Sequence, residues 1–311
     1  MNKIERVLAA LNNQEVDRPP FSFWYHFGLQ HMDGIKHAEA EVGFYRAYDL
    51  DFLKVMNDYP YPLPDGLSTL ETEDDWKRLA PISASGDCWN EQLAAVASIH
   101  EQIGKDALFI DTIFSPWTVA RRLAGASGLA RARRDFPKTL RAAMENIASS
   151  LASYAGESIA RGSDGVFFSL GAATDDVMSV EEYSTWARPF DMQVLGGATS
   201  GRFNVLHIHG NWIHFSSVLD YPAHALNWSH YATAPELAAG KSLSGRSVIG
   251  GINESAITKL TPRELADQIR AAIAEAGPRG LIIGPGCSIP TDTPAAQLRS
   301  VKMTLESIGR P

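Results

Sequence analysis

The sequence predicts an α/β fold in which residues 1–311 form a single (β/α)8 barrel, also called a TIM barrel. Three observations lead to this class. Eight short apolar segments with the character of strands alternate with helical segments, an order typical of a parallel sheet. The length of 311 residues suits a barrel of about 250 residues with insertions. No Gly-x-Gly-x-x-Gly motif follows the first expected strand, which counts against an open dinucleotide-binding sheet.

The first part of the chain is expected to form an N-terminal helix, three strands and an inserted helical segment. Residues 3–13 place apolar side chains on one stripe of a helix, and Asp-Arg-Pro-Pro at 17–20 ends it. Three prolines within 58–66 preclude regular structure, and 70–104 have the pattern of an insertion with short helices between the second and third strands. The strands are expected at 21–26, 50–57 and 107–114, with a helix at 38–48.

The second part of the chain is expected to supply five strands and the helices between them. Ser115 with Pro116 has the pattern of a helix start, and Thr261 with Glu264 forms a capping box. The remaining strands are expected at 165–169, 204–209, 225–228, 247–252 and 281–284, and helices at 136–161, 180–199, 261–276 and 294–308.

Composition excludes several classes of function. The net charge of -8 and the pI near 5.6 are not those of a nucleic-acid-binding protein or one that binds an anionic membrane. No apolar run approaches the roughly 20 residues of a transmembrane helix, and the N-terminus lacks the apolar core of a signal peptide. Only two cysteines are present, Cys88 and Cys287, so a reducing cytoplasm is the expected location.

Two histidines and a cysteine are the strongest candidates for a functional site. His207 and His209 lie two apart on the fifth expected strand, so both point to one side of the sheet. Cys287 follows the eighth strand in a Gly/Pro-rich loop, and barrels of this kind collect their functional residues at the carboxyl ends of the strands. Two imidazoles and a thiolate match the three protein ligands of a catalytic zinc, which would leave one position open for a thiol or a water. The three residues are therefore expected to be metal ligands.

Other residues at the strand ends are candidates for catalysis and substrate binding. Asp58 is expected to orient substrate or to act as a base, and three asparagines are expected to bind polar substrate groups. An aromatic or histidine side chain at a strand end also has a plain structural reading, as barrel packing. The candidates for catalysis are Asp58, Asn211, Asn227 and Asn253, and those for substrate binding are Tyr25, His26, Phe114 and Trp228.

Along most of its length the chain resembles the uroporphyrinogen decarboxylase superfamily, which implies a (β/α)8 barrel. The superfamily includes cofactor-free decarboxylases and zinc-dependent methyltransferases that move methyl groups between a corrinoid protein and a thiol. The motifs that carry the resemblance are Arg6-Val-Leu-Ala-Ala-Leu, Asp17-Arg-Pro-Pro, Phe114-Ser-Pro-Trp-Thr-Val-Ala, Leu206-His-Ile-His-Gly-Asn, Ala225-Leu-Asn-Trp and Gly284-Pro-Gly-Cys-Ser-Ile-Pro-Thr-Asp-Thr-Pro.

The resemblance to the decarboxylases is incomplete at their substrate-binding positions. Their Arg-Gln-Ala-Gly-Arg motif corresponds here to Tyr25-His-Phe-Gly-Leu, which has no arginine. Their central aspartate matches Asp58, their tyrosine corresponds to Arg122, and their late histidine corresponds to Pro285. A substrate with several carboxylates needs charge-assisted partners, so uroporphyrinogen itself is disfavoured.

The resemblance to the methyltransferases extends to the ligand positions. Their strand histidine matches His207 and their late cysteine matches Cys287, whereas His209 stands in place of a cysteine. Imidazole is an accepted zinc ligand but is less electron-rich than thiolate, so a bound thiolate would be a weaker nucleophile. This departure leaves several alternatives open. The methyl acceptor could be a thiol or a folate-like amine, the reaction could be demethylation of a methoxylated compound, or the site could lack metal.

Four functions follow, in order of preference. The first is a zinc-dependent methyltransferase that moves a methyl group between a corrinoid on a partner protein, or a methoxylated small molecule, and a small acceptor. The second is a cofactor-free carboxy-lyase, of the uroporphyrinogen decarboxylase type, with Asp58 stabilising a protonated intermediate. The third is a non-catalytic barrel that binds a tetrapyrrole or a corrinoid protein, and the fourth is a zinc hydrolase. Barrels of this kind often form homodimers, and no apolar stripe in this sequence specifies one.

Overall fold

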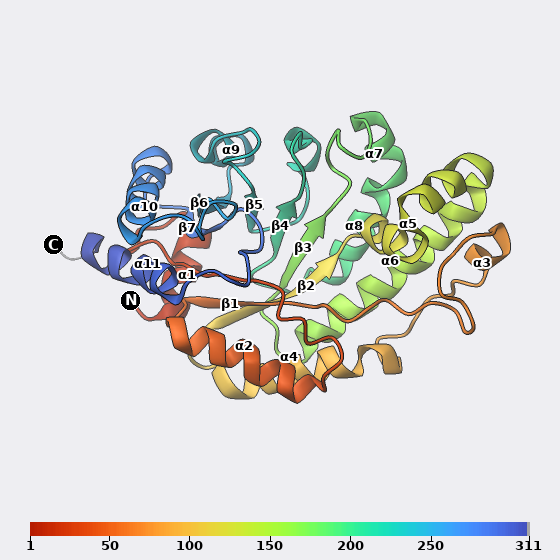
Figure 1. Cartoon of the computed structure of the whole chain (residues 1–311), viewed down its shortest axis with the longest axis horizontal. Helices are drawn as coiled ribbons and strands as arrows, with labels where there is room; N and C mark the ends of the chain where they lie inside the picture. The colour runs from red at the N-terminus through yellow and green to blue at the C-terminus, as the bar shows by residue number, and fades with distance from the viewer. Residues whose placement is uncertain (310–311) are drawn as a thin grey trace.

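The computed structural model describes residues 1–309 and contains a parallel sheet of seven strands that follow one another in chain order. The strands lie side by side along a curled sheet, and the helices surround them (Figure 1). This is an α/β fold with parallel strands, compatible with a TIM-barrel-like architecture. The strands are β1 (Phe52–Val55), β2 (Leu108–Phe114), β3 (Val166–Leu170), β4 (Val205–Ile208), β5 (Ala225–Trp228), β6 (Ser247–Ile252) and β7 (Leu281–Pro285).

The first expected strand, residues 21–26, is absent from the sheet, and only Phe21 forms an isolated parallel bridge, with Ile283 of β7. On the side of β7, the N–H of Ile283 donates to the carbonyl of Pro20 at 2.8 Å. On the side of β1, the N–H of Asp51 donates to the carbonyl of Phe21 at 3.0 Å. The N–H of Phe21 donates to the carboxylate of Asp51 at 2.9 Å. No continuous ladder forms, because Pro20 has no N–H and a side chain takes the N–H of Phe21.

Six helices begin at a residue whose side chain caps the first turn. Thr261 caps α10 in a capping box with Glu264, as its spacing predicts. The helix expected at 180–199 is two helices, which meet at Ala187 (φ -124°) directly before the Arg188-Pro pair. No helix within residues 1–309 combines the length and the apolar character that a bilayer span requires. The helices are α1 (Lys3–Leu11), α2 (Gly34–Tyr48), α3 (Glu73–Lys77), η1 (Asp87–Trp89), α4 (Asn90–Ile103), α5 (Pro116–Asp135), α6 (Pro137–Ala160), α7 (Val180–Trp186), α8 (Arg188–Gly197), η2 (Phe215–Val218), α9 (Leu237–Ser244), α10 (Pro262–Ala276) and α11 (Ala295–Ile308).

One face of the sheet changes from apolar to polar along its strands. On β4, Val205 belongs to an apolar cluster and His207, two residues later on the same face, is a buried polar side chain. On β5, Ala225 and Asn227 repeat the pattern. Ala10 of α1 belongs to the same apolar cluster. Apolar packing therefore fills the amino-terminal ends of the strands, and polar side chains collect at the carboxyl ends.

Candidate functional site

His207 is held by the neighbouring strand. It is paired in register with Asn227 of β5, and its Nδ1 lies 2.7 Å from Oδ1 of that asparagine. The amide Nδ2 of Asn227 donates to the carbonyls of Ile249 and Pro285, both at 3.0 Å, which fixes Oδ1 as the acceptor. Nδ1 of His207 must therefore carry the hydrogen, and Nε2 remains free to bind a ligand. The ring also stacks on Phe167, with centroids 5.2 Å apart.

His209 and Cys287 complete a cluster with His207. Nδ1 of His209 lies 3.7 Å from Sγ of Cys287, and one ligand atom from each of the three residues lies within 4.8 Å of the others. Gly210 follows His209 with φ 137°, and a Cβ there would lie 2.5 Å from Oγ1 of Thr174, so only glycine fits this exit from β4.

Glu254 holds the loop that carries Cys287. One carboxylate oxygen accepts the N–H of Gly286 at 3.1 Å, and the other accepts the hydroxyl of Ser229. A Cβ on Gly286 would lie 2.5 Å from Cα of Ser229, so glycine is needed for the loop to approach the end of β5 so closely. Glu254 is 7% exposed, and its two bonds fix the backbone directly before Cys287.

The thiol of Cys287 is activated by its neighbours. Burial raises its pKa, but a hydrogen bond from His207 and the charge of that ring lower it more, and the net shift is below the ordinary value. The cluster thus offers a thiol that ionises readily, beside an imidazole whose Nε2 either donates to that thiolate or, once its proton has left, offers a lone pair to a ligand.

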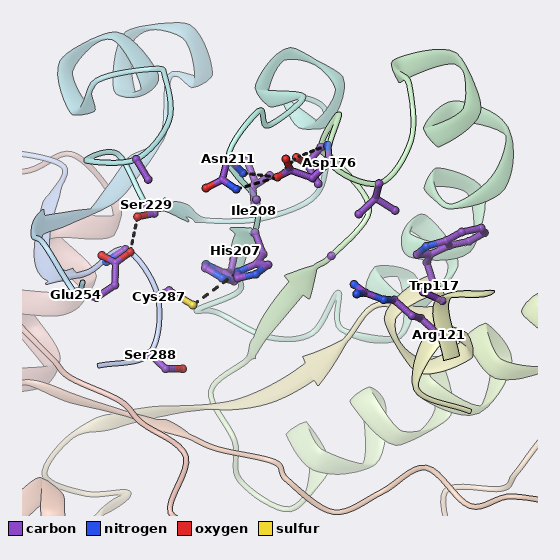
Figure 2. Close-up of a pocket in the computed structure, with 18 of the residues that line it drawn as sticks. Trp117, Arg121, Asp176, His207, Ile208, Asn211, Ser229, Glu254, Cys287 and Ser288 are labelled. Carbon is purple, nitrogen blue, oxygen red and sulfur yellow. Dashed lines mark hydrogen bonds between the residues drawn. The ribbon is translucent and has the colours of Figure 1, made fainter. Parts of the chain in front are cut away.

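The cluster lies in the wall of an open hollow at the carboxyl ends of the strands. Two cavities of about 670 Å³ and about 500 Å³ share His207, His209 and Cys287 in their lining. In the close-up, Cys287 and His207 lie at the centre, Ser229 and Glu254 on one side, and Arg121 and Trp117 of α5 on the other (Figure 2). Both cavities can therefore present a ligand to the cluster.

The three residues fit a tetrahedral metal with one open position. Zinc bonds to nitrogen and sulfur of about 2.0–2.3 Å place neighbouring donor atoms roughly 3.5 Å apart. The 3.7 Å between His209 and Cys287 matches that separation, and all three donor atoms lie within 4.8 Å of one another. The hydrogen bond from His207 to Asn227 is the kind of contact that orients a metal-bound histidine.

The four polar residues expected in catalysis lie in different places. Asn227 holds His207 from beneath the cavity. Asn211 lies at the rim, where Asp176 accepts its backbone N–H at 2.7 Å. Asn253 lines neither cavity, since its Oδ1 caps the turn after β6 by accepting the N–H groups of Ser255 and Ala256. Asp58 accepts from His26 at 2.6 Å, and this bond holds the pKa of the carboxyl below its usual value although burial opposes the shift.

The four residues expected to bind substrate also separate. His26 and Phe114 line the 500 Å³ cavity. Tyr25 packs against Phe27, with ring centroids 4.3 Å apart, and lines neither cavity. Trp228 is fully buried, and its Nε1 donates to the carbonyl of Pro235 at 2.8 Å. The structure therefore places Tyr25 and Trp228 in side-chain packing outside the cavities.

Three of the charged lining residues were not among those expected to act in catalysis, substrate binding or metal binding. Glu254 follows β6 and is the neighbour of the expected Asn253. The side chain of Asn253 caps a turn, and Glu254 is the one that lines the cavity. Lys54 lies within an apolar strand and lines the smaller cavity. Because lysine is rarely buried, its presence in such a strand could have indicated a functional residue. Arg121 follows the Pro-Trp-Thr motif on α5 and lines both cavities.

The family model described as uroporphyrinogen decarboxylase (URO-D) matches residues 61–307. Among curated protein sequences, none matches the chain.

Several solved structures share the fold at low sequence identity. A methyltransferase from Methanosarcina mazei superimposes with a TM-score of 0.76 and 18% identity, over 100% of both chains. A B12-independent methionine synthase from Shewanella sp. W3-18-1, in complex with selenomethionine, superimposes with a TM-score of 0.65 and 13% sequence identity. The match covers 94% of this chain and 93% of that one. A putative vitamin-B12 independent methionine synthase from Listeria monocytogenes superimposes with a TM-score of 0.60 and 12% sequence identity. The match covers 88% of this chain and 86% of that one.

Proposed function

The chain belongs to the uroporphyrinogen decarboxylase (URO-D) family, and within it we propose that this protein is a zinc-dependent methyltransferase. His207, His209 and Cys287 would hold the metal. The observation that carries the proposal is the hydrogen bond from Nδ1 of His207 to Asn227, because it leaves Nε2 to act as the ligand atom in a cluster whose three donor atoms lie within 4.8 Å of one another. The fold shared with a solved methyltransferase and a solved methionine synthase supports the same proposal.

The methyl donor would be a corrinoid on a partner protein or a methoxylated small molecule, and the acceptor a small thiol or amine. Zinc bound to this cluster would supply Lewis-acid activation of a thiol near neutral pH. With a methylated corrinoid as donor, the thiol sulfur bonds to the methyl carbon and the carbon–cobalt bond breaks. Its electron pair remains on cobalt, which is reduced from Co(III) to Co(I), and the thiol proton passes to solvent.

The chain's own residues would position and shield these groups. Asn227 fixes the ring of His207, and Glu254 with Ser229 fixes the loop of Cys287. Aromatic side chains from three elements, Trp24, Phe114 and Phe167, line the 500 Å³ cavity and would exclude water from a small substrate. His209 replaces a thiolate by a neutral donor, which leaves the ligand set less electron-rich and favours an acceptor that is already a good nucleophile.

A cofactor-free carboxy-lyase is the second candidate, and the pairing of Asp58 with His26 favours it. This pair lies beside a cavity that also holds the cations Lys54, Arg121 and Arg122. An ionised Asp58 could stabilise a protonated intermediate formed as carbon dioxide leaves.

Methyl transfer from methylcobalamin to dithiothreitol tests the proposal. We expect the full-length protein to consume the methyl–cobalt absorbance and to form the methyl thioether, and Cys287→Ala and His207→Ala to lose at least 100-fold in rate. A rate that both variants retain, or no turnover by a protein that holds zinc, would contradict it. Release of carbon dioxide from uroporphyrinogen that survives Cys287→Ala and is lost in Asp58→Asn would establish the second candidate instead.

A further inference from the structure

Lys54 is a buried lysine that forms no ion pair with an acidic residue of the described part of the chain, residues 1–309. It is 3% exposed and lines the 500 Å³ cavity. Within residues 1–309, Nζ makes one hydrogen bond, to Sδ of Met56 at 3.1 Å, and lies 4.8 Å from the ring centroid of Phe167. A thioether and an aromatic face are weak partners for an ammonium group.

The nearby carboxylates are committed to other groups. Glu41 accepts the backbone N–H of Met56 at 2.7 Å and lies 3.4 Å from His37, and Asp111 accepts from Ser158 at 2.9 Å. Their charges act on Lys54 only at longer range. Burial lowers the pKa of Lys54 to about 8, so the group is mostly cationic at neutral pH and pays for desolvation without a counter-ion.

Two guanidinium groups face the same cavity. Arg121 and Arg122 of α5 line it, and neither forms a hydrogen bond or an ion pair with residues 1–309. Arg122 stacks on the ring of Phe114, 3.7 Å from its centroid. Arg121 extends from α5 towards the cluster in the close-up (Figure 2). The cavity thus gathers three cations and presents them to whatever enters it.

We propose that Lys54 and Arg121 form a recognition site for the carboxylate of a small substrate whose apolar body lies against Trp24, Phe114 and Phe167. An ammonium group and a planar guanidinium are charge-assisted donors for a carboxylate. The class follows from the lining, because Trp24, Phe114 and Phe167 suit the apolar body of an organic acid and give nothing to the further oxygens of an inorganic phosphate. This site rests on the proposed function only for the orientation of the bound substrate, whose reacting group would face His207 and Cys287.

Two probes that differ only in charge test the site. Binding of 4-methoxybenzoate and of 4-methoxybenzamide is measured by calorimetry at pH 7 with the full-length protein. We expect the acid to bind at least tenfold more tightly than the amide, since a hydrogen bond to a charged group contributes most when buried. Lys54→Met should reduce this preference at least threefold and leave the affinity for the amide unchanged, since Arg121 remains in the cavity. The methionine has similar volume and apolar surroundings, so this variant is expected to fold.

Controls separate this site from the metal and from general anion binding. Lys105→Met removes the same charge from an exposed turn and should keep the preference. Treatment of the wild-type protein with a chelator should also keep it, so the site can stand even where the methyltransferase proposal fails. Equal affinity for acid and amide, a preference of unchanged size in Lys54→Met, or inorganic phosphate that competes as well as the acid would overturn the assignment.

Discussion

Nδ1 of His207 donates to Oδ1 of Asn227 across 2.7 Å, between two residues paired in register on adjacent strands. The asparagine is itself fixed by two backbone carbonyls, those of Ile249 and Pro285. Removing either carbonyl contact would free the amide to rotate and would remove the reason for the tautomer of His207. The chemistry of the site therefore depends on a residue that lies beneath the cavity.

Asn227→Leu removes the acceptor of this hydrogen bond. We expect the dissociation constant for zinc to rise about 10- to 100-fold, the usual cost of losing such an orienting contact. Stability should fall by about 1–3 kcal/mol, because the carbonyls of Ile249 and Pro285 lose their donor. Competition with a chromophoric chelator gives the affinity and urea unfolding gives the stability.

Asn253→Leu is the matched control for this variant. It makes the same replacement just after the next strand, at a residue that caps a turn outside the cavities. It should lower stability and leave zinc affinity within twofold of the wild type. Equal loss of zinc affinity in both variants would show that a general loss of structure, and not the orientation of His207, was measured.

Glu254→Gln should loosen the loop of Cys287. The amide of glutamine cannot accept from both Gly286 and Ser229, so one of these contacts is lost. We expect about tenfold weaker zinc binding and a weaker thiolate-to-cobalt absorption band after substitution of the site with Co(II). Glu275→Gln changes a carboxylate that accepts the N–H of Ala238 at 2.8 Å far from the cluster, and it should leave the band intact. An unaltered band in Glu254→Gln would disprove the role.

Asp191 predicts a pH dependence of stability that is independent of the site. Burial raises its pKa to about 8, although hydrogen bonds from Tyr183 and Tyr221 oppose the shift. The folded state therefore keeps a proton that the unfolded state loses above about pH 4. The stabilisation of the folded state by protonated Asp191 is fully present below about pH 4 and is lost as the pH rises towards 8. Urea unfolding from pH 5 to 8 should show this decline.

Asp191→Asn should reduce the decline, because the amide does not ionise. Asp267→Asn, at an exposed residue paired with Arg270 at 3.1 Å, should leave it unchanged. If wild type and Asp191→Asn have the same slope of stability against pH, Asp191 is ionised in the folded protein.

The sequence predicted the parallel α/β architecture because apolar runs and helix caps are local signals. Seven of the eight expected strands are present within residues 1–309. The segment 21–26 has the composition of a strand, but its pairing depends on Asp51, which takes the N–H of Phe21 from 30 positions away in the chain. The break near Ala187 had a local signal in the following Arg188-Pro pair, which the helical pattern outweighed.

The candidate site was predictable where strand ends determine position. His207, His209 and Cys287 lie together because parallel strands bring their carboxyl ends to one edge. Which neighbouring side chain faces the cavity could not be read from the sequence, as Asn253 and Glu254 show. Aromatic character could not separate Trp228, which packs in the core, from Phe114, which lines the cavity.

Metal content of the purified full-length protein tests the central claim most directly. Elemental analysis should find about one zinc per chain in the wild type. His207→Ala and Cys287→Ala should hold much less, and His209→Cys should retain zinc because thiolate is also a zinc ligand. Wild-type protein purified in zinc-containing medium that carries no metal, and whose stability does not change with a chelator, would contradict the account.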